Sequence, residues 1–395
     1  MKVVIIHSRY QSGSTSGENR VVEDEESLLR QAGHDVHVWM PSVPESGSIG
    51  RVRTGAAAVW SASAKSTVEQ LVQRHHPDVV HCHNLFPALS PSVLRAADGV
   101  PIVVTLHNYR LLCLPGTFLR EGRICESCLG HAPWRGIVHR CYHDSMAASG
   151  AIATSVSVHR AARTFSRPDM YLAVSTFVRD KHVEAGFSPE RIKVKPNFAW
   201  PTARREGAGE YFLFLGRLTA EKGLDSLFAA FDRLQGVPLV VVGEGPDASR
   251  LKSLAPSGVE FRGAVDPAEL AKIFRGARAL VFPSIWYEGA PRVIIEAYAA
   301  GVPVIASRIG GVPELIEEER SGLLVDQGNT EAWSSAIERL LDDTESLRLG
   351  EGAWNLWNEG FRPEHGLENL ESAYRDVVGD ERVTGATRSG SGREG

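Results

Sequence analysis

Two glutamates with seven residues between them, and with largely apolar neighbours, stand in the stretch 279–307. Glu288 falls in a predicted loop after a buried strand, and Glu296 lies about a turn and a half into a helix predicted to start at Pro291. The first amides of a helix have no partner within it, so they can bind a phosphate group. Carboxylates on both sides of that site suit a nucleotide sugar, which has hydroxyls at both ends and a diphosphate between them. The alternative, two solvated glutamates, is disfavoured by the apolar surroundings.

A second candidate group follows the predicted strand 211–215, in the sequence GRLTAEKGL. Arg217 and Lys222 stand five residues apart there, in a loop punctuated by glycine. Such a pair can bind a diphosphate from two sides, although two solvated loop charges would give the same pattern. The next predicted strand, 239–243, ends in a similar turn that contains Glu244.

Histidines mark the ends of two buried strands in the N-terminal half, predicted at 78–83 and 102–106. His81 and His83 stand at the first, and His107 directly follows the second. Ligands of open parallel sheets bind at the carboxyl ends of the strands, where a histidine can form hydrogen bonds near neutral pH. For His81 and His83 a metal pair, an acceptor contact and simple packing all remain open.

Four of the five cysteines are clustered within about thirty residues, in a loop-rich region with few large aliphatic side chains. A C-x2-C pair flanked by single cysteines can supply four thiolates to a tetrahedral zinc ion. Structural zinc is the favoured interpretation, ahead of redox-active thiols and of disulfides. The fifth cysteine, Cys82, is expected to be a small buried residue. The predicted zinc ligands are Cys113, Cys125, Cys128 and Cys141.

Strands and helices alternate along the chain, which predicts an α/β protein with doubly wound parallel sheets. A length of 395 residues favours two domains, and a segment rich in proline, arginine and glycine places the boundary near residue 202. The net charge of −5 gives no indication of a nucleic-acid partner. No apolar run reaches the length of a signal-peptide core or a membrane span, so a cytoplasmic location is expected.

The E-x7-E stretch, the G-R-L-x-x-x-K-G loop and the T-L-H-N-Y segment resemble the motifs of retaining glycosyltransferases of family 4. The resemblance extends to about residue 378 and implies the GT-B fold, in which two Rossmann-like domains face each other across a cleft. It assigns the donor hexose to Glu288 and His107, the ribose to Glu296, and the diphosphate to Arg217 and Lys222. The remaining donor contacts that it implies are Gly289, Ala290, Val293 and Ile294 through the amides of the E-x7-E segment, and Gly17, Glu244 and Arg262 elsewhere.

The resemblance also implies a domain plan. Residues 1–202 would form the acceptor-side domain, with a cysteine-rich insertion at 110–145, and residues 203–362 would form the donor domain. A C-terminal helix at 363–378 would pack back on the first domain. The tail from residue 379 contains no core-forming residues and is expected to be disordered.

The implied reaction transfers a hexose from a UDP-, GDP-, ADP- or dTDP-sugar to a hydroxyl group, with retention of the anomeric configuration. The leaving phosphate would help to deprotonate the acceptor, and Arg217 and Lys222 would offset its charge without a catalytic metal. The acceptor would be a glycan, a natural product or a lipid-linked molecule, and the last would bring the enzyme to the inner face of the membrane. The alternatives are another GT-B sugar-nucleotide enzyme, such as an epimerase, and a zinc- or redox-binding protein on a degenerate transferase fold.

Overall fold

The computed structural model describes residues 1–9, 16–42 and 48–379, which form two compact units. Unit 1 comprises Met1–Gly116, Glu126–Lys195 and the C-terminal segment from Gly366. Unit 2 comprises Thr117–Cys125 and Pro196–His365. Each unit contains one six-stranded sheet whose neighbouring strands all pair in parallel.

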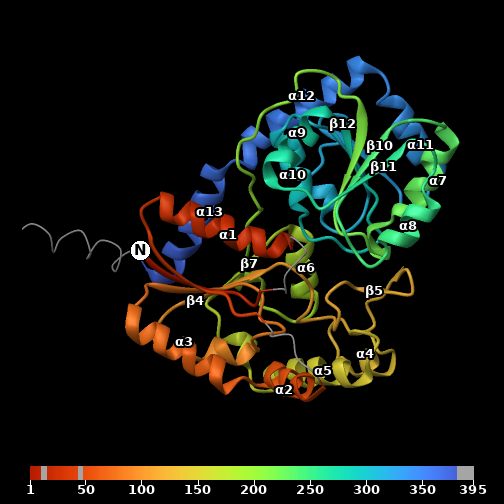
Figure 1. Ribbon diagram of the computed structural model, residues 1–395. Coiled ribbons are helices and arrows are strands. Elements are labelled where there is room, and N and C mark those ends of the chain that lie inside the picture. The colour runs from red at the N-terminus through yellow and green to blue at the C-terminus, as the bar shows by residue number, and fades with distance from the viewer. Residues whose placement is uncertain (10–15, 43–47, 380–395) are drawn as a thin grey trace, which may run out of the picture. The chain divides into compact units, whose positions relative to one another are not determined.

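The sheet of unit 1 has the strand order β2-β1-β3-β4-β7-β8. Its central strands β3, β4 and β7 are buried along their whole length, as expected where helices cover both faces (Figure 1). The strands are β1 (Lys2–Ile6), β2 (Asp35–Trp39), β3 (Val79–Cys82), β4 (Ile102–Leu106), β7 (Met170–Ala173) and β8 (Ile192–Val194). The helices are α1 (Gly17–Gln31), α2 (Ser48–Val59), α3 (Ala62–His75), α4 (Trp134–Val138), α5 (Met146–Ala161), α6 (Thr176–Glu184) and α13 (Pro363–Val378), the last belonging to this unit from Gly366 on.

Helix α13 is bonded to the sheet of unit 1 by side chains far away in sequence. Glu371 accepts a hydrogen bond from His34 over 3.0 Å, and the Tyr374 hydroxyl lies 2.8 Å from Nδ1 of His81. Tyr374 is fully buried, so α13 forms part of the core of this unit rather than an appendage.

The sheet of unit 2 has the strand order β11-β10-β9-β12-β13-β14. The strands are β9 (Tyr211–Leu215), β10 (Leu239–Val242), β11 (Val259–Gly263), β12 (Ala277–Phe282), β13 (Val304–Ser307) and β14 (Gly322–Val325), and a separate hairpin consists of β5 (Leu119–Arg120) and β6 (Arg123–Ile124). The helices are α7 (Leu224–Leu234), α8 (Ala248–Leu254), α9 (Pro267–Gly276), α10 (Arg292–Ala299), α11 (Thr330–Arg339) and α12 (Asp343–Gly360).

Alternating side chains of this sheet pack into two separate cores. Leu213, Leu280 and Phe282 face the core that includes α9, α10 and α12. Phe212 and Val281 face the opposite core, with α7, α8 and α11. Figure 1 shows the two helical layers on either side of the sheet. With both faces covered, only the ends of the strands remain open to a ligand.

The predicted α/β class with two doubly wound parallel sheets is confirmed. Two local details differ from expectation. Pro291 is the N-cap of α10, with an extended ψ of 117°, so the helix begins one residue later than predicted. Helix α12 was not predicted from the sequence. The tail predicted to be disordered lies, apart from Gly379, outside the described residues.

Candidate active site

Three loops meet at the carboxyl edge of the unit 2 sheet, after β9, β12 and β13. Two glycines make the contact possible. A Cβ atom on Gly223, whose φ is +74°, would lie 1.9 Å from the carbonyl oxygen of Pro283. A Cβ atom on Gly310, at φ +58°, would lie 2.5 Å from the carbonyl oxygen of Glu288. Only glycine fits both the left-handed conformation and the close approach, so the β9 and β13 loops pack directly against the β12 loop that carries Glu288.

Glu288 is held by three donors that all bind the same oxygen. Its Oε1 accepts hydrogen bonds from Lys222 Nζ over 2.7 Å, Ser284 Oγ over 2.8 Å and Trp286 Nε1 over 2.7 Å. The residue is only 5% exposed. No hydrogen bond joins its Oε2 to any described residue, and this atom is not among the buried unpartnered atoms, so solvent reaches it. The carboxylate is therefore fixed at one oxygen and open at the other.

Glu296 lies on α10 and is paired with a residue one turn earlier. Arg292 Nη2 donates to its Oε1 over 2.9 Å, and the glutamate side chain is 27% exposed. At the start of the helix, the Ile294 amide donates to the Pro291 carbonyl over 3.2 Å, and the Ala290 carbonyl accepts from Asn197 Nδ2 over 2.9 Å.

The other predicted donor residues occupy more open positions. Arg217 is exposed in the β9 loop. Glu244 is exposed after β10, and its backbone carbonyl accepts from the Leu218 amide over 2.9 Å. Arg262 is exposed on β11 and forms an ion pair with Glu260. Within unit 2 the structure thus brings Lys222 and Glu288 into contact. Gly289 is buried beside Glu288, Val293 packs against the core, and Gly17 opens α1 in unit 1.

His107 lies in unit 1 at the end of β4, beside a small pocket that it lines together with His83, Asn84 and Arg110. Its Nε2 is 2.9 Å from Nδ1 of His83. Burial, reinforced by neighbouring positive charge, lowers the pKa of both histidines well below the ordinary value, so both rings are neutral at pH 7.

His81 lies on β3 and forms hydrogen bonds through both ring nitrogens. Nδ1 is 2.8 Å from the Tyr374 hydroxyl, and Nε2 is 2.8 Å from Thr105 Oγ1. Burial and then the charge of Lys195 lower the pKa of His81 to about 3. This histidine is a hydrogen-bonded core residue, one of the three readings that the sequence left open.

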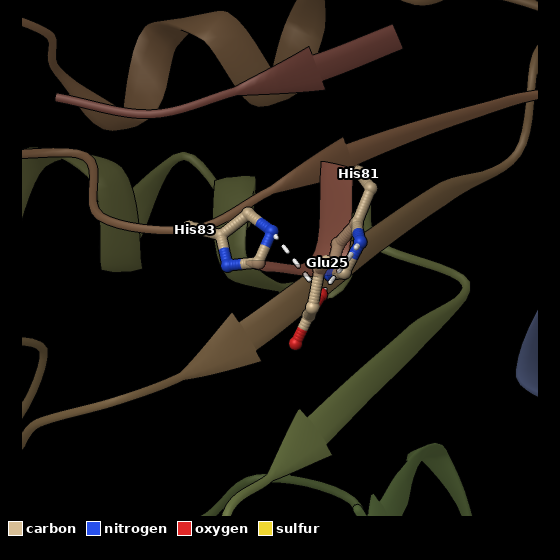
Figure 2. Close-up of side chains that lie close together, drawn as sticks. All are labelled: Glu25, His81 and His83. Atoms are coloured by element: carbon tan, nitrogen blue, oxygen red, sulfur yellow. Dashed lines mark ion pairs between the residues drawn. The ribbon is translucent and has the colours of Figure 1, made fainter. Parts of the chain in front are cut away.

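Two charged residues in this cluster were not expected from the sequence. Glu25 on α1 and Lys195 after β8 form an ion pair between Oε1 and Nζ, and both residues are almost completely buried. Figure 2 shows the Glu25 carboxylate with His81 and His83, whose ring nitrogens lie 4.0 and 3.7 Å from Oε2. A signal was present: Glu25 occupies the buried stripe of α1 with Val21, Val22, Leu28 and Leu29.

The four clustered cysteines are divided between the units. Cys125 belongs to unit 2, and the other three belong to unit 1. Cys113 is buried, and Cys125, Cys128 and Cys141 are half-buried, and their assignment as zinc ligands remains a prediction. The fifth, Cys82, is completely buried in β3, where burial raises the pKa of its thiol to about 12. It is the small buried residue that was predicted.

Sequence comparisons match most of the chain to glycosyltransferase families. Residues 15–199 match the model of "Glycosyltransferase Family 4", and residues 209–343 match "Glycosyl transferases group 1". A D-inositol 3-phosphate glycosyltransferase of Acidothermus cellulolyticus is 31% identical over 349 residues, covering 80% of this chain and 70% of that protein. One of Corynebacterium glutamicum is 35% identical over 193 residues, where the alignment spans 45% of this chain and only 46% of that protein.

Among solved structures, a sucrose-phosphate synthase of Thermosynechococcus elongatus superposes with a TM-score of 0.70 at 18% identity, covering 95% of this chain and 98% of that one. Two parallel-sheet units with this likeness define a GT-B glycosyltransferase fold. The chain belongs to glycosyltransferase family 4. The predicted family and the predicted enzyme class, a glycosyltransferase, are therefore confirmed. None of the helices in the described part of the chain is long and apolar enough to cross a membrane.

Proposed function

We propose that this enzyme transfers a hexose from a nucleoside diphosphate sugar to a hydroxyl acceptor with retention of configuration, and that the donor binds at the Lys222–Glu288 pair of unit 2. The observation that carries the proposal is the geometry of Glu288. A buried carboxylate with one oxygen saturated and the other open to solvent accepts a hydrogen bond from a hydroxyl group in one defined direction.

Lys222 is the cation of this pair, and its side chain is 20% exposed. The ammonium group has three donor hydrogens and uses one on Glu288, which leaves the others for phosphate oxygens. As the glycosyl bond breaks, negative charge grows on the leaving diphosphate, and a fixed cation stabilises that state more than the ground state. Arg217, exposed in the same loop, supplies a second cation. In this mechanism no step requires a metal ion.

Glu296 is the proposed ribose ligand. Arg292 occupies its Oε1, and a carboxylate retains acceptor capacity at its second oxygen for the ribose hydroxyls. The pairing with Arg292 also limits the rotation of the glutamate side chain, which reduces the entropy lost on binding.

The cysteine-rich insertion, 110–145, is proposed to shape the acceptor side and to define a subgroup within the family. Its support is a contact within unit 2: the ring of Phe118, next to the β5–β6 hairpin, lies 6.1 Å from the ring of Tyr287, edge to face. Tyr287 precedes Glu288, so the hairpin adjoins the proposed hexose site.

The donor class can be tested with a thermal-shift panel of UDP, GDP, ADP and dTDP sugars. A ligand at a hundred times its Kd stabilises the folded protein by about 2.7 kcal/mol, which raises Tm by a few degrees. The wild type should respond to one nucleotide class, and Glu296→Ala should not. Glu338→Ala, at an exposed helical glutamate on α11, is the matched control and should respond like the wild type. A Glu296→Ala protein that binds as tightly as the wild type would refute the ribose assignment.

A further inference from the structure

The hydrogen bond between His83, which is buried, and His107, which is half-buried, has a polarity that the family resemblance does not supply. His83 and His107 share a single hydrogen bond between Nδ1 and Nε2. Both rings are neutral, and a neutral imidazole has one N–H and one lone pair. One ring must therefore donate and the other accept, which leaves two arrangements of opposite polarity.

The residue that faces the other ring nitrogen of His83, which is Glu25, decides between the two arrangements. Nε2 of His83 faces Oε2 of Glu25 at 3.7 Å, and neither atom has a hydrogen-bond partner among the described residues. If His83 donated to His107, its Nε2 would present a lone pair to a carboxylate oxygen, and two acceptors would face each other away from water. If His83 accepts from His107, its Nε2 carries the proton and directs it at the carboxylate.

Lys195 fixes the charge of Glu25. Its ammonium binds Oε1 of the carboxylate where both side chains are 2% exposed or less. This contact stabilises the ionised carboxylate, and an ionised carboxylate has no proton to donate to His83. The charge pair thus excludes the first arrangement.

We propose that Glu25 and His83 are positioning residues that hold His107 as the Nε2–H tautomer, so that Nδ1 of His107 is a hydrogen-bond acceptor for a substrate hydroxyl. Nδ1 has no partner among the described residues and is absent from their buried unpartnered atoms, so solvent reaches it. The tautomer assignment depends only on residues of unit 1. The use of Nδ1 by a hydroxyl group of the sugar or the acceptor depends on the proposed function.

A divalent cation between Glu25, His81 and His83 is the competing interpretation, because their ligand atoms lie within 4.8 Å of one another (Figure 2). Two contacts weigh against it. Lys195 already neutralises the carboxylate, so a cation would add two positive charges beside a buried ammonium. His81 would also have to exchange its hydrogen bond to Tyr374 for the metal.

The direct test is the imidazole 15N spectrum of the full-length protein, labelled at histidine, at pH 7. The signals of His83 and His107 are assigned from their loss in His83→Gln and His107→Gln. We expect both rings to be protonated at Nε2 and unprotonated at Nδ1. Protonation of His107 at Nδ1 would overturn the proposal, and so would His83 signals that shift when a chelator is added, because these would indicate the metal.

The variant Glu25→Gln tests whether Glu25 determines the polarity of the hydrogen bond between His83 and His107. Lys195 needs an acceptor, so it orients the new amide with its oxygen toward Nζ and its NH2 group toward His83. The polarity of the pair should then reverse, with His107 protonated at Nδ1 and kcat/KM for transfer lowered about tenfold or more. Glu26→Gln, at the half-buried neighbour on α1 that pairs with Arg30, is the matched control and should change neither.

The outcomes are separable. If Glu25→Gln does not fold, the wild-type spectrum alone decides the tautomer. A reversed tautomer with unchanged kcat/KM would overturn the use of Nδ1 by the substrate. Failure of the proposed function itself would instead appear as a wild-type protein that responds to no nucleotide sugar, whatever its tautomer.

Discussion

Acidification should destabilise unit 1 through His81, and the direction of the effect follows from its burial. The folded protein lowers the pKa of this ring from 6.5 to about 3, chiefly by desolvation. As the pH falls below 6.5, the unfolded chain therefore binds a proton that the folded chain does not. The contribution of His81 to the free energy of unfolding is fully present above pH 6.5 and is lost progressively as the pH falls to about 3.

The magnitude can be worked out for the step from pH 7 to pH 5. With an unfolded pKa of 6.5 and a folded pKa of about 3, His81 alone reduces the free energy of unfolding by about 2 kcal/mol, or about 25-fold in the equilibrium constant. His83 and His107 are shifted in the same direction, so the total loss in the wild type should be at least this large.

Native-state hydrogen exchange by mass spectrometry would measure this loss unit by unit, after correction for the intrinsic pH dependence of exchange. Peptides from β3 and β4 should lose at least 25-fold protection in the wild type. In His81→Gln, which keeps a donor and an acceptor for Thr105 and Tyr374, the loss should be about 25-fold smaller. His131→Gln, at an exposed histidine of the same unit, is the control. Equal losses in His81→Gln and the wild type would refute the reasoning.

Three further predictions concern the loops and the cysteines. Lys222→Met should lower kcat/KM for sugar transfer about 100-fold or more, and it should also lower the melting temperature because the buried Glu288 loses its cationic partner. Lys272→Met, at an exposed lysine of α9, should change neither, and equal rates in the two variants would remove Lys222 from the diphosphate site. Gly223→Ala should lower the free energy of unfolding in urea by more than about 1 kcal/mol, because its Cβ meets a backbone oxygen at 1.9 Å, whereas Gly236→Ala, also at positive φ but with nothing within 4 Å, should cost less. Metal analysis should find about one zinc per chain, reduced in Cys125→Ser, and a zinc-free wild type grown with zinc would show that prediction to be wrong.

The fold could be predicted from the sequence because helices cover both faces of each sheet, so the strands appear in the sequence as largely apolar runs. The run 211–215 is continuously apolar and the run 102–106 is apolar except for Thr105, and the structure places β9 and β4 at those residues. Helix boundaries were less accurate. Pro291 fits the first helical position and the N-cap almost equally well by residue type, and only its extended ψ of 117° in the structure identifies it as the N-cap.

The residue types of the unit 2 site were predictable, but their contacts were not. Lys222 and Glu288 were proposed for separate parts of the donor, and the structure joins them directly. Trp286 was interpreted as an apolar neighbour, yet its indole N–H donates to the carboxylate. These bonds depend on how closely the loops approach, and that distance is set by glycine contacts between separate segments, Gly223 with Pro283 and Gly310 with Glu288.

In unit 1 the sequence did not reveal which residue pairs with the buried carboxylate of Glu25. Glu25 could have been recognised as a charged residue in an apolar stripe, but the cation that neutralises it lies 170 residues further along the chain. A buried charge in a helix stripe predicts that a partner exists and does not say which residue it is.

The two carboxylate systems follow the same physical rule. Glu288 is saturated at Oε1 by three donors and open at Oε2, and Glu25 is neutralised at Oε1 by Lys195 and faces a histidine at Oε2. In each carboxylate, contacts within the protein occupy Oε1 and determine which groups Oε2 can bind. In the functions proposed above, Oε2 of Glu288 would accept a hydrogen bond from the ligand, and Glu25 would act through His83 to leave Nδ1 of His107 as an acceptor. Both proposed positions present lone pairs to hydrogen-bond donors, and the hydroxyl groups of a sugar are such donors.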